Sequence, residues 1–226
     1  MFRKRRNTLA AGLPAWFCWD YDPAELRLDA AVHAFAVSAG LAAAATLFAG
    51  VLEAGLTPKR TTALLYAIGL LAMLCASAAY SLWPLTPTKW LLRRFDQAVI
   101  YLFIAATCTA FLAHARHGWI ALAVVWPAAL LGAALKLAWP GRCERLCIGS
   151  YFLLGWAGAC GFWLGMDLPG TTVRLIVLGG LLYTAGLLFY LWERLRFHYA
   201  IWHLFALVGA ASHFLAVLTS LPAFSA

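Results

Sequence analysis

Charged residues are scarce in this sequence, and no polar stretch is long enough to form a soluble domain. Asp, Glu, Lys and Arg together make up 12% of the 226 residues, whereas 64% are hydrophobic. A water-soluble domain carries roughly a quarter charged residues, which keep its surface hydrated. The shortage of charge therefore excludes a soluble globular protein and indicates that a lipid bilayer is the solvent.

The cysteines offer no framework for disulfide bonds. The six cysteines are scattered along the chain, and Cys75, Cys108 and Cys160 fall inside apolar segments. A secreted disulfide scaffold would instead concentrate them in a short chain. Cys143 and Cys147 stand four residues apart and could share a helix face near a metal, but chance explains such a pair more readily.

Seven apolar stretches of helical length recur between short polar breaks. A transmembrane helix needs roughly 20 mostly apolar residues. The predicted spans are 28–52, 61–83, 97–113, 119–139, 146–164, 173–191 and 199–221. Short links make neighbouring helices antiparallel, and an open sheet would leave backbone groups unpaired in lipid. The predicted fold class is therefore an all-α membrane protein, a seven-transmembrane helical bundle.

The basic residues predict how this bundle is oriented. Lys and Arg collect in cytoplasmic loops. If the N-terminus is cytoplasmic and the C-terminus outside, thirteen of the 17 basic residues lie on the inner side and four, Lys59, Arg60, Arg116 and Arg174, on the outer side. The predicted organisation is a cytoplasmic arm at 1–27, the transmembrane domain at 28–221 and a short tail at 222–226.

The net charge of +8 predicts contact with membrane lipids and no nucleic-acid partner. The cluster from Arg3 to Arg6 precedes an apolar run that ends at Phe17, as in a signal peptide, but this run is short and weak. Pro14, Trp16 and Trp19 indicate an interfacial segment on the cytoplasmic surface instead. Protein partners cannot be read from this pattern.

Polar residues inside spans usually face the interior of a bundle, because lipid cannot satisfy them. With the predicted orientation, four spans place such residues at one depth, just inside the cytoplasmic interface. These residues are Asp29 and His33 in the first span, Ser77 and Ser81 in the second, Asp96 beside the third, and Tyr199 and His203 in the seventh.

Helical geometry indicates which of these side chains share a face. Residues four apart lie on one face of a helix, as Tyr199 and His203 do. His213 stands ten residues beyond His203, about 15 Å deeper, and so cannot share its first coordination shell. His198 points about 140° away from His203, toward a loop or the headgroups.

These polar positions resemble the hemolysin III branch of the progestin and adipoQ receptor family, which includes the adiponectin receptors. The resemblance covers nearly all of the chain from Asp22, and the final block is the most specific. The matching segments are Glu25 with His33, Ser77-Ala-Ala-Tyr80-Ser81, the run from Leu92 to Leu102, Tyr183-Thr184-Ala185-Gly186, Ala200-Ile201-Trp202-His203-Leu204-Phe205, and the run from His213 to Val217.

The resemblance implies a zinc ion near the cytoplasmic side, held by three histidines, with an Asp and a Ser supporting a metal-bound water. Asp96 and Ser77 match these supporting positions. The sequence departs from the pattern, however, because Ser81 and Tyr199 stand where the family has two of its three ligand histidines. Only His203 remains, and hydroxyl groups are poor zinc ligands beside imidazole.

Two interpretations of the centre stay open. A rearranged zinc site would use His203 with His33 and Asp96, or would recruit His198. In a metal-free cluster, Ser77, Ser81, Asp96, Tyr199 and His203 would hydrogen-bond across helices.

Three functions follow from the resemblance and the altered ligands. The preferred one is a non-enzymatic, multi-pass protein of the bacterial inner (plasma) membrane that acts in membrane homeostasis. The alternative is a zinc-dependent hydrolase of an amide-linked lipid at the inner leaflet. The third is a receptor, or a transporter of protons or solutes.

Overall fold

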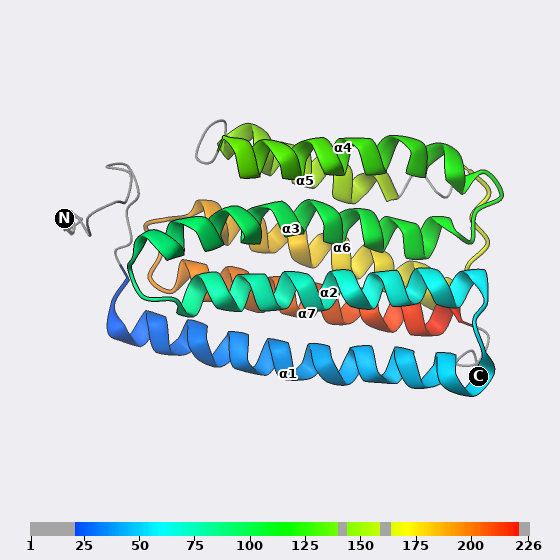
Figure 1. Cartoon of the computed structure of the whole chain (residues 1–226), viewed down its shortest axis with the longest axis horizontal. Coiled ribbons are helices and arrows are strands. Elements are labelled where there is room, and N and C mark those ends of the chain that lie inside the picture. The colour runs from blue at the N-terminus through cyan, green and yellow to red at the C-terminus, as the bar shows by residue number, and fades with distance from the viewer. Residues whose placement is uncertain (1–20, 140–143, 159–163, 222–226) are drawn as a thin grey trace.

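Seven α-helices joined by short connections make up the part of the chain that the computed structural model describes, residues 21–139, 144–158 and 164–221 (Figure 1). They are α1 (Pro23–Ala54), α2 (Pro58–Leu82), α3 (Pro87–Leu112), α4 (Gly118–Ala138), α5 (Glu144–Ala157), α6 (Gly170–Leu191) and α7 (His198–Ser220). Six are long and apolar enough to cross a membrane, and α5 contributes the shorter apolar helix Leu146–Ala157. The predicted helical bundle is confirmed. The stretch 159–163 of the predicted fifth span lies outside the described residues.

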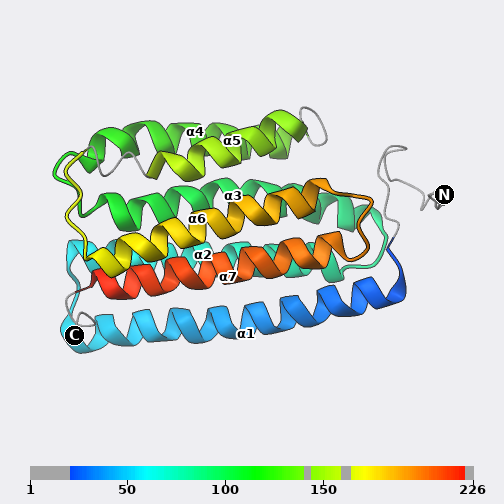
Figure 2. The same ribbon diagram turned by 180° about the vertical axis from the view of Figure 1, so that it is seen from behind.

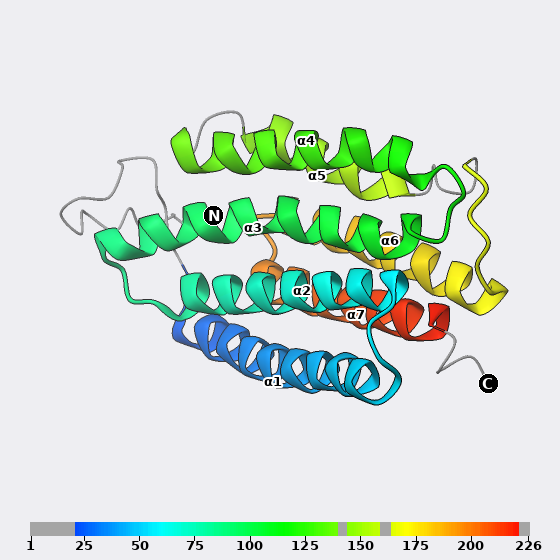
Figure 3. The same cartoon turned by 45° about the vertical axis from the view of Figure 1, so that its right-hand side comes forward.

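The helices form two layers. Figures 1 and 2 show α1, α2, α3 and α4 side by side on one face of the bundle, with α5, α6 and α7 on the other. In Figure 3 the ends of α6 and α7 emerge from behind α2 and α3. The most extensive packing joins α6 to α7, and α1 closes the edge against both α2 and α7. We call the end at which α1, α3 and α7 begin the inner end, after the side to which the basic residues assign it.

Proline and capping residues set where the helices begin. The Asp22 carboxylate accepts hydrogen bonds from the backbone N–H groups of Ala24 and Glu25, and the Glu25 carboxylate accepts one from the N–H of Asp22. This capping box starts α1 five residues before the predicted span. A proline in the first turn, where its missing N–H is harmless, also begins α2 and α3.

The start of α3 corrects one prediction. The charged segment 84–94 was predicted to be a break between spans, yet α3 already begins at Pro87. The reason is Lys89, whose buried ammonium group donates to the carbonyls of Tyr80, Ser81 and Trp83 at 2.7, 3.0 and 2.8 Å. A single lysine thus satisfies the last carbonyls of α2 and lets a charged segment continue as helix.

The third helix is the centre of the bundle. In its most apolar stretch 67% of the residues are buried, against 17% to 33% in the other long helices. It contributes Phe103 and Phe111 to a core shared with α1, α2 and α7, and Tyr101 and Leu112 to a second core with α4 and α5. Large apolar side chains such as Phe35, which is 67% exposed, cover the outer faces. The pattern fits helices surrounded by lipid.

Several sequence predictions fall outside the described residues. The structure does not describe residues 1–20, which make up most of the predicted arm. It also does not describe residues 222–226, the whole predicted tail. Cys75, Cys108 and Cys147 are free thiols, and Cys147 lies within α5. Its predicted neighbour Cys143 is not among the described residues.

The Lys89 cap predicts a large effect of one substitution. Lys89→Met keeps the apolar stem but leaves three carbonyls without their donor, so the free energy of unfolding should fall by about 2 to 4 kcal/mol. Unfolding in mixed micelles with increasing SDS measures this change. Lys59→Met, at an exposed lysine in the first turn of α2, is the control and should be near neutral. Equal stability of the two variants would contradict the role of Lys89.

Candidate metal centre

Polar side chains from α1, α2, α3 and α7 meet at the inner end of the bundle. Asp29, His33, Ser81, Asp96 and His203 are all at most 9% exposed. Burial of this kind in an apolar bundle requires that each polar group finds a partner within the protein. The pairing among these side chains therefore decides what the centre can bind.

Asp29 is the hub of the centre. Its Oδ1 accepts a hydrogen bond from Nδ1 of His203 at 2.5 Å. Its Oδ2 lies 3.6 Å from Nε2 of His33, one helical turn further along α1. The two imidazole rings meet edge to face, with centroids 4.4 Å apart. One carboxylate thus hydrogen-bonds to a histidine of α7 and lies beside a histidine of its own helix.

Asp29, His33 and His203 form a group that could hold a metal ion. One ligand atom from each lies within 4.8 Å of the other two. Zinc bonds to nitrogen and oxygen of about 2.0 to 2.2 Å place tetrahedral ligand atoms about 3.3 Å apart, so small side-chain shifts would close the site. Nε2 of His33 is buried without a hydrogen-bond partner, so its lone pair is available to bind a metal ion. The donor set of two imidazoles and a carboxylate fits zinc.

Asp96 and Ser77 lie beside this group. The Ser77 hydroxyl lies near the Asp96 carboxylate, and Asp96 is near enough to His203 for their charges to interact. The rearranged site predicted from the sequence used Asp96 as the third ligand. The group of ligand atoms that the structure brings together instead contains Asp29, which shares a helix face with His33.

The two residues at the altered ligand positions border the centre. The Ser81 hydroxyl lies near the Asp29 carboxylate and is buried without a hydrogen-bond partner of good geometry. The Tyr199 ring packs edge to face on His203, with centroids 4.3 Å apart. Both side chains therefore line the centre, although the group that could hold a metal does not include them.

The other two predicted histidines lie apart from the group that could hold a metal. His198 is buried at the start of α7, where its ring stacks on Tyr21 with centroids 5.9 Å apart. His213 donates from Nε2 to the carbonyl of Ile176 at 3.1 Å and packs against Tyr183. His198 and His213 thus have their own structural surroundings.

Sequence reasoning placed Asp29 at the right depth but did not include it among the candidate ligands. The signal was present in the spacing, because Asp29 and His33 are four residues apart and so lie on one face of α1. The family pattern drew attention to Asp96 instead. What spacing could not show is that His203 approaches Asp29, a contact across 174 residues.

These features define a class of protein: a multi-pass helical membrane protein with a buried acid–histidine centre near one end of its bundle. The chain belongs to the haemolysin-III related family, whose pattern matches residues 26–214.

Two curated relatives support the assignment. The chain is 39% identical over 127 residues to Hemolysin-3 of Bacillus cereus, covering 54% of this chain and 58% of that protein. It is 38% identical over 135 residues to the Hemolysin-3 homolog of Bacillus subtilis (strain 168), covering 58% of this chain and 63% of that protein. The chain thus spans about three fifths of the length of these relatives. No solved structure matches it.

The hub role of Asp29 predicts that its charge stabilises the bundle. Asp29→Asn keeps the shape of the side chain but weakens both histidine contacts, and should lower the free energy of unfolding by about 1 to 3 kcal/mol. Asp167→Asn, at an exposed position between α5 and α6, serves as the control. Thermal unfolding of the metal-free proteins, followed by circular dichroism, compares them. A stability loss no greater than that of the control would rule out the hub.

Proposed function

We propose that this protein acts in membrane homeostasis and carries a rearranged zinc centre, held by Asp29, His33 and His203, at the inner leaflet of the plasma membrane. The observation that carries the proposal is the convergence of the three ligand atoms within 4.8 Å, in a buried setting where His33 Nε2 has no hydrogen-bond partner. Membership of the haemolysin-III related family supports the membrane role.

Each residue has a distinct part in this centre. His33 and His203 would bind the ion through imidazole nitrogens, and Asp29 would balance its charge, since its carboxylate already contacts both rings. Ser81 and Tyr199 pack around the group and keep lipid from it. The polar centre lies at the expected depth of the inner headgroups, so lipid is the nearest molecule on which it can act.

Zinc analysis of the purified protein tests the centre. We expect about one zinc per chain after loading and washing. His203→Gln should lose most of it, because two ligands hold zinc far more weakly than three. His198→Gln, which removes a buried histidine outside the group, should keep the metal. A wild-type protein without zinc, or equal loss in both variants, would contradict the proposal.

A zinc-dependent hydrolase of an amide-linked lipid is the second candidate. The observation in its favour is the Asp96–Ser77 pair beside His203. A zinc ion with three protein ligands supplies an acidified water and polarises a carbonyl. In this function Asp96 would accept or deliver a proton near that ion, with the Ser77 hydroxyl beside its carboxylate.

Turnover of a defined lipid separates the two functions. If the protein is a hydrolase, the zinc-loaded form should release fatty acid from a ceramide in micelles, and Asp96→Asn should lower the rate by about 100-fold or more while zinc stays bound. The homeostasis proposal expects no release from either protein. Release that Asp96→Asn leaves unchanged would remove Asp96 from any catalytic role.

A further inference from the structure

A small cleft opens between α1 and α7 at the inner end and leads to the metal centre. Its lining residues are Tyr21, Glu25, Leu26, Asp29, Phe197, Tyr199 and Ala200. Asp29 is the hub of the centre, and Tyr199 packs on its ligand His203. The cleft therefore joins the surface at the inner end to one of the three proposed ligands.

The lining of the cleft favours positive charge. Among the residues that the structure describes, it contains two carboxylates, those of Glu25 and Asp29, and no lysine or arginine. Three of the other lining residues are aromatic, and aromatic faces attract cations. A narrow cleft with one sign of charge concentrates ions of the opposite sign.

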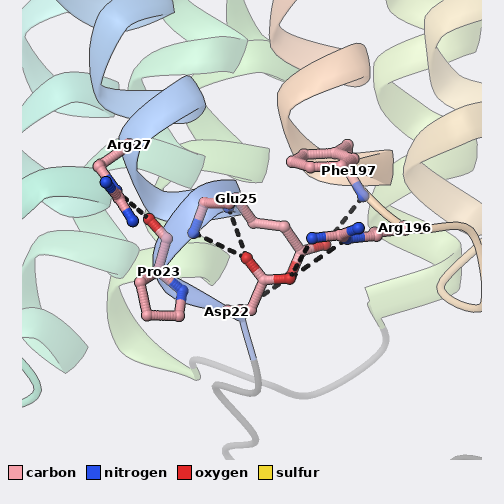
Figure 4. A network of polar contacts seen from close by, with 7 residues as sticks. Asp22, Pro23, Glu25, Arg27, Arg196 and Phe197 are labelled. Atoms are coloured by element: carbon pink, nitrogen blue, oxygen red, sulfur yellow. Dashed lines mark hydrogen bonds and ion pairs between the residues drawn. The ribbon is translucent and has the colours of Figure 1, made fainter.

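Two polar contacts join the start of α1 to the segment before α7, beside the cleft (Figure 4). Nη2 and Nε of Arg196 donate to Oδ2 of Asp22 at 3.0 and 3.2 Å. The backbone N–H of Phe197 donates to Oε1 of Glu25 at 2.8 Å. These contacts link the first turn of α1 to the residues that lead into α7, which lie 172 to 174 positions away in sequence.

The Asp22–Arg196 contact is weak. Asp22 and Arg196 are exposed, with side chains 41% and 66% accessible, and exposed ion pairs are weak. The backbone N–H groups of Glu25 and Ala24, with Arg196 beside them, hold the pKa of Asp22 below its ordinary value, so its charge persists at neutral pH. Phe197 has a left-handed backbone with φ 62°, a conformation that bulky residues rarely adopt. Loss of its bond to Glu25 would let it relax.

We infer that the cleft between α1 and α7 is the route by which a divalent cation reaches Asp29 from the inner surface, and that the Asp22–Arg196 and Glu25–Phe197 contacts are the latch that closes it. The inference rests on the proposed function, since the cation is the metal of the proposed centre. Opening the latch changes how fast the ion enters and leaves. It leaves the ligands, and hence the equilibrium affinity, unchanged.

Rates of metal exchange in the full-length protein test the latch. Asp22→Asn and Arg196→Gln each remove one charge, and asparagine caps α1 as well as aspartate does. Zinc uptake and its release to a chelator should both become about two- to fivefold faster, the effect of one exposed ion pair, at unchanged affinity. Arg194→Gln, an exposed arginine in the same turn, is the control and should exchange zinc at the wild-type rate.

A second readout does not depend on zinc. Ala200→Cys places a thiol on the wall of the cleft, and Leu26→Cys is a second reporter should the first variant fold poorly. A methanethiosulfonate reagent with a trimethylammonium group should label the cysteine faster than a sulfonate reagent of similar size. Adding Arg196→Gln should accelerate the cationic reagent about two- to fivefold.

The two readouts separate the latch from the metal centre. If the wild type takes up no zinc but Arg196→Gln speeds cationic labelling, the zinc proposal fails and the cation route stands. If zinc binds but Arg196→Gln alters neither exchange nor labelling, the latch is overturned and the metal centre stands. If the sulfonate reagent labels the cysteine faster than the trimethylammonium reagent does, the cation route itself is overturned.

Discussion

The inner end of this bundle depends on one requirement, that a carboxylate buried among apolar helices must find its partners inside the protein. Asp29 meets it by accepting a hydrogen bond from His203 and by lying beside His33. An unpaired charge in such surroundings would cost several kcal/mol, so these contacts fix how α1 and α7 approach each other. The same contacts assemble two imidazoles and a carboxylate, the donor set of a zinc centre.

The rest of the inner end satisfies the same requirement in other ways. Lys89 gives its three donors to the last carbonyls of α2, which holds Ser81 next to the centre. Ser77 of α2 lies near the Asp96 carboxylate of α3. Toward the opposite end, small and apolar residues such as Ala67, Leu70 and Ala210 pack together, and isolated polar pairs such as Thr172 with Thr219 lie among them. The group that could hold a metal therefore lies at the inner end, while the rest of the bundle is held mainly by apolar packing.

Much of the fold could be predicted from the sequence, because apolar length and the breaks between spans are local properties. The start of α3 could not, since the charges of Lys89, Arg93 and Arg94 look like a loop until the carbonyls of α2 are placed beside Lys89. The centre was half predictable. The predicted depths in the membrane placed His33 and His203 at one level. Only the packing of α1 on α7 makes Asp29, rather than Asp96, the third residue of the group that could hold a metal.

We propose that Asp29 and His33 complete a ligand set around His203 that differs from the one the family resemblance implies, in which histidines would stand at the positions of Ser81 and Tyr199. X-ray absorption at the zinc edge of the purified, zinc-loaded protein tests it most directly. Two imidazoles and one carboxylate at about 2.0 to 2.2 Å are predicted, with the carboxylate contribution lost in Asp29→Ala. A spectrum with sulfur ligands, or one that Asp29→Ala leaves unchanged, would contradict the account.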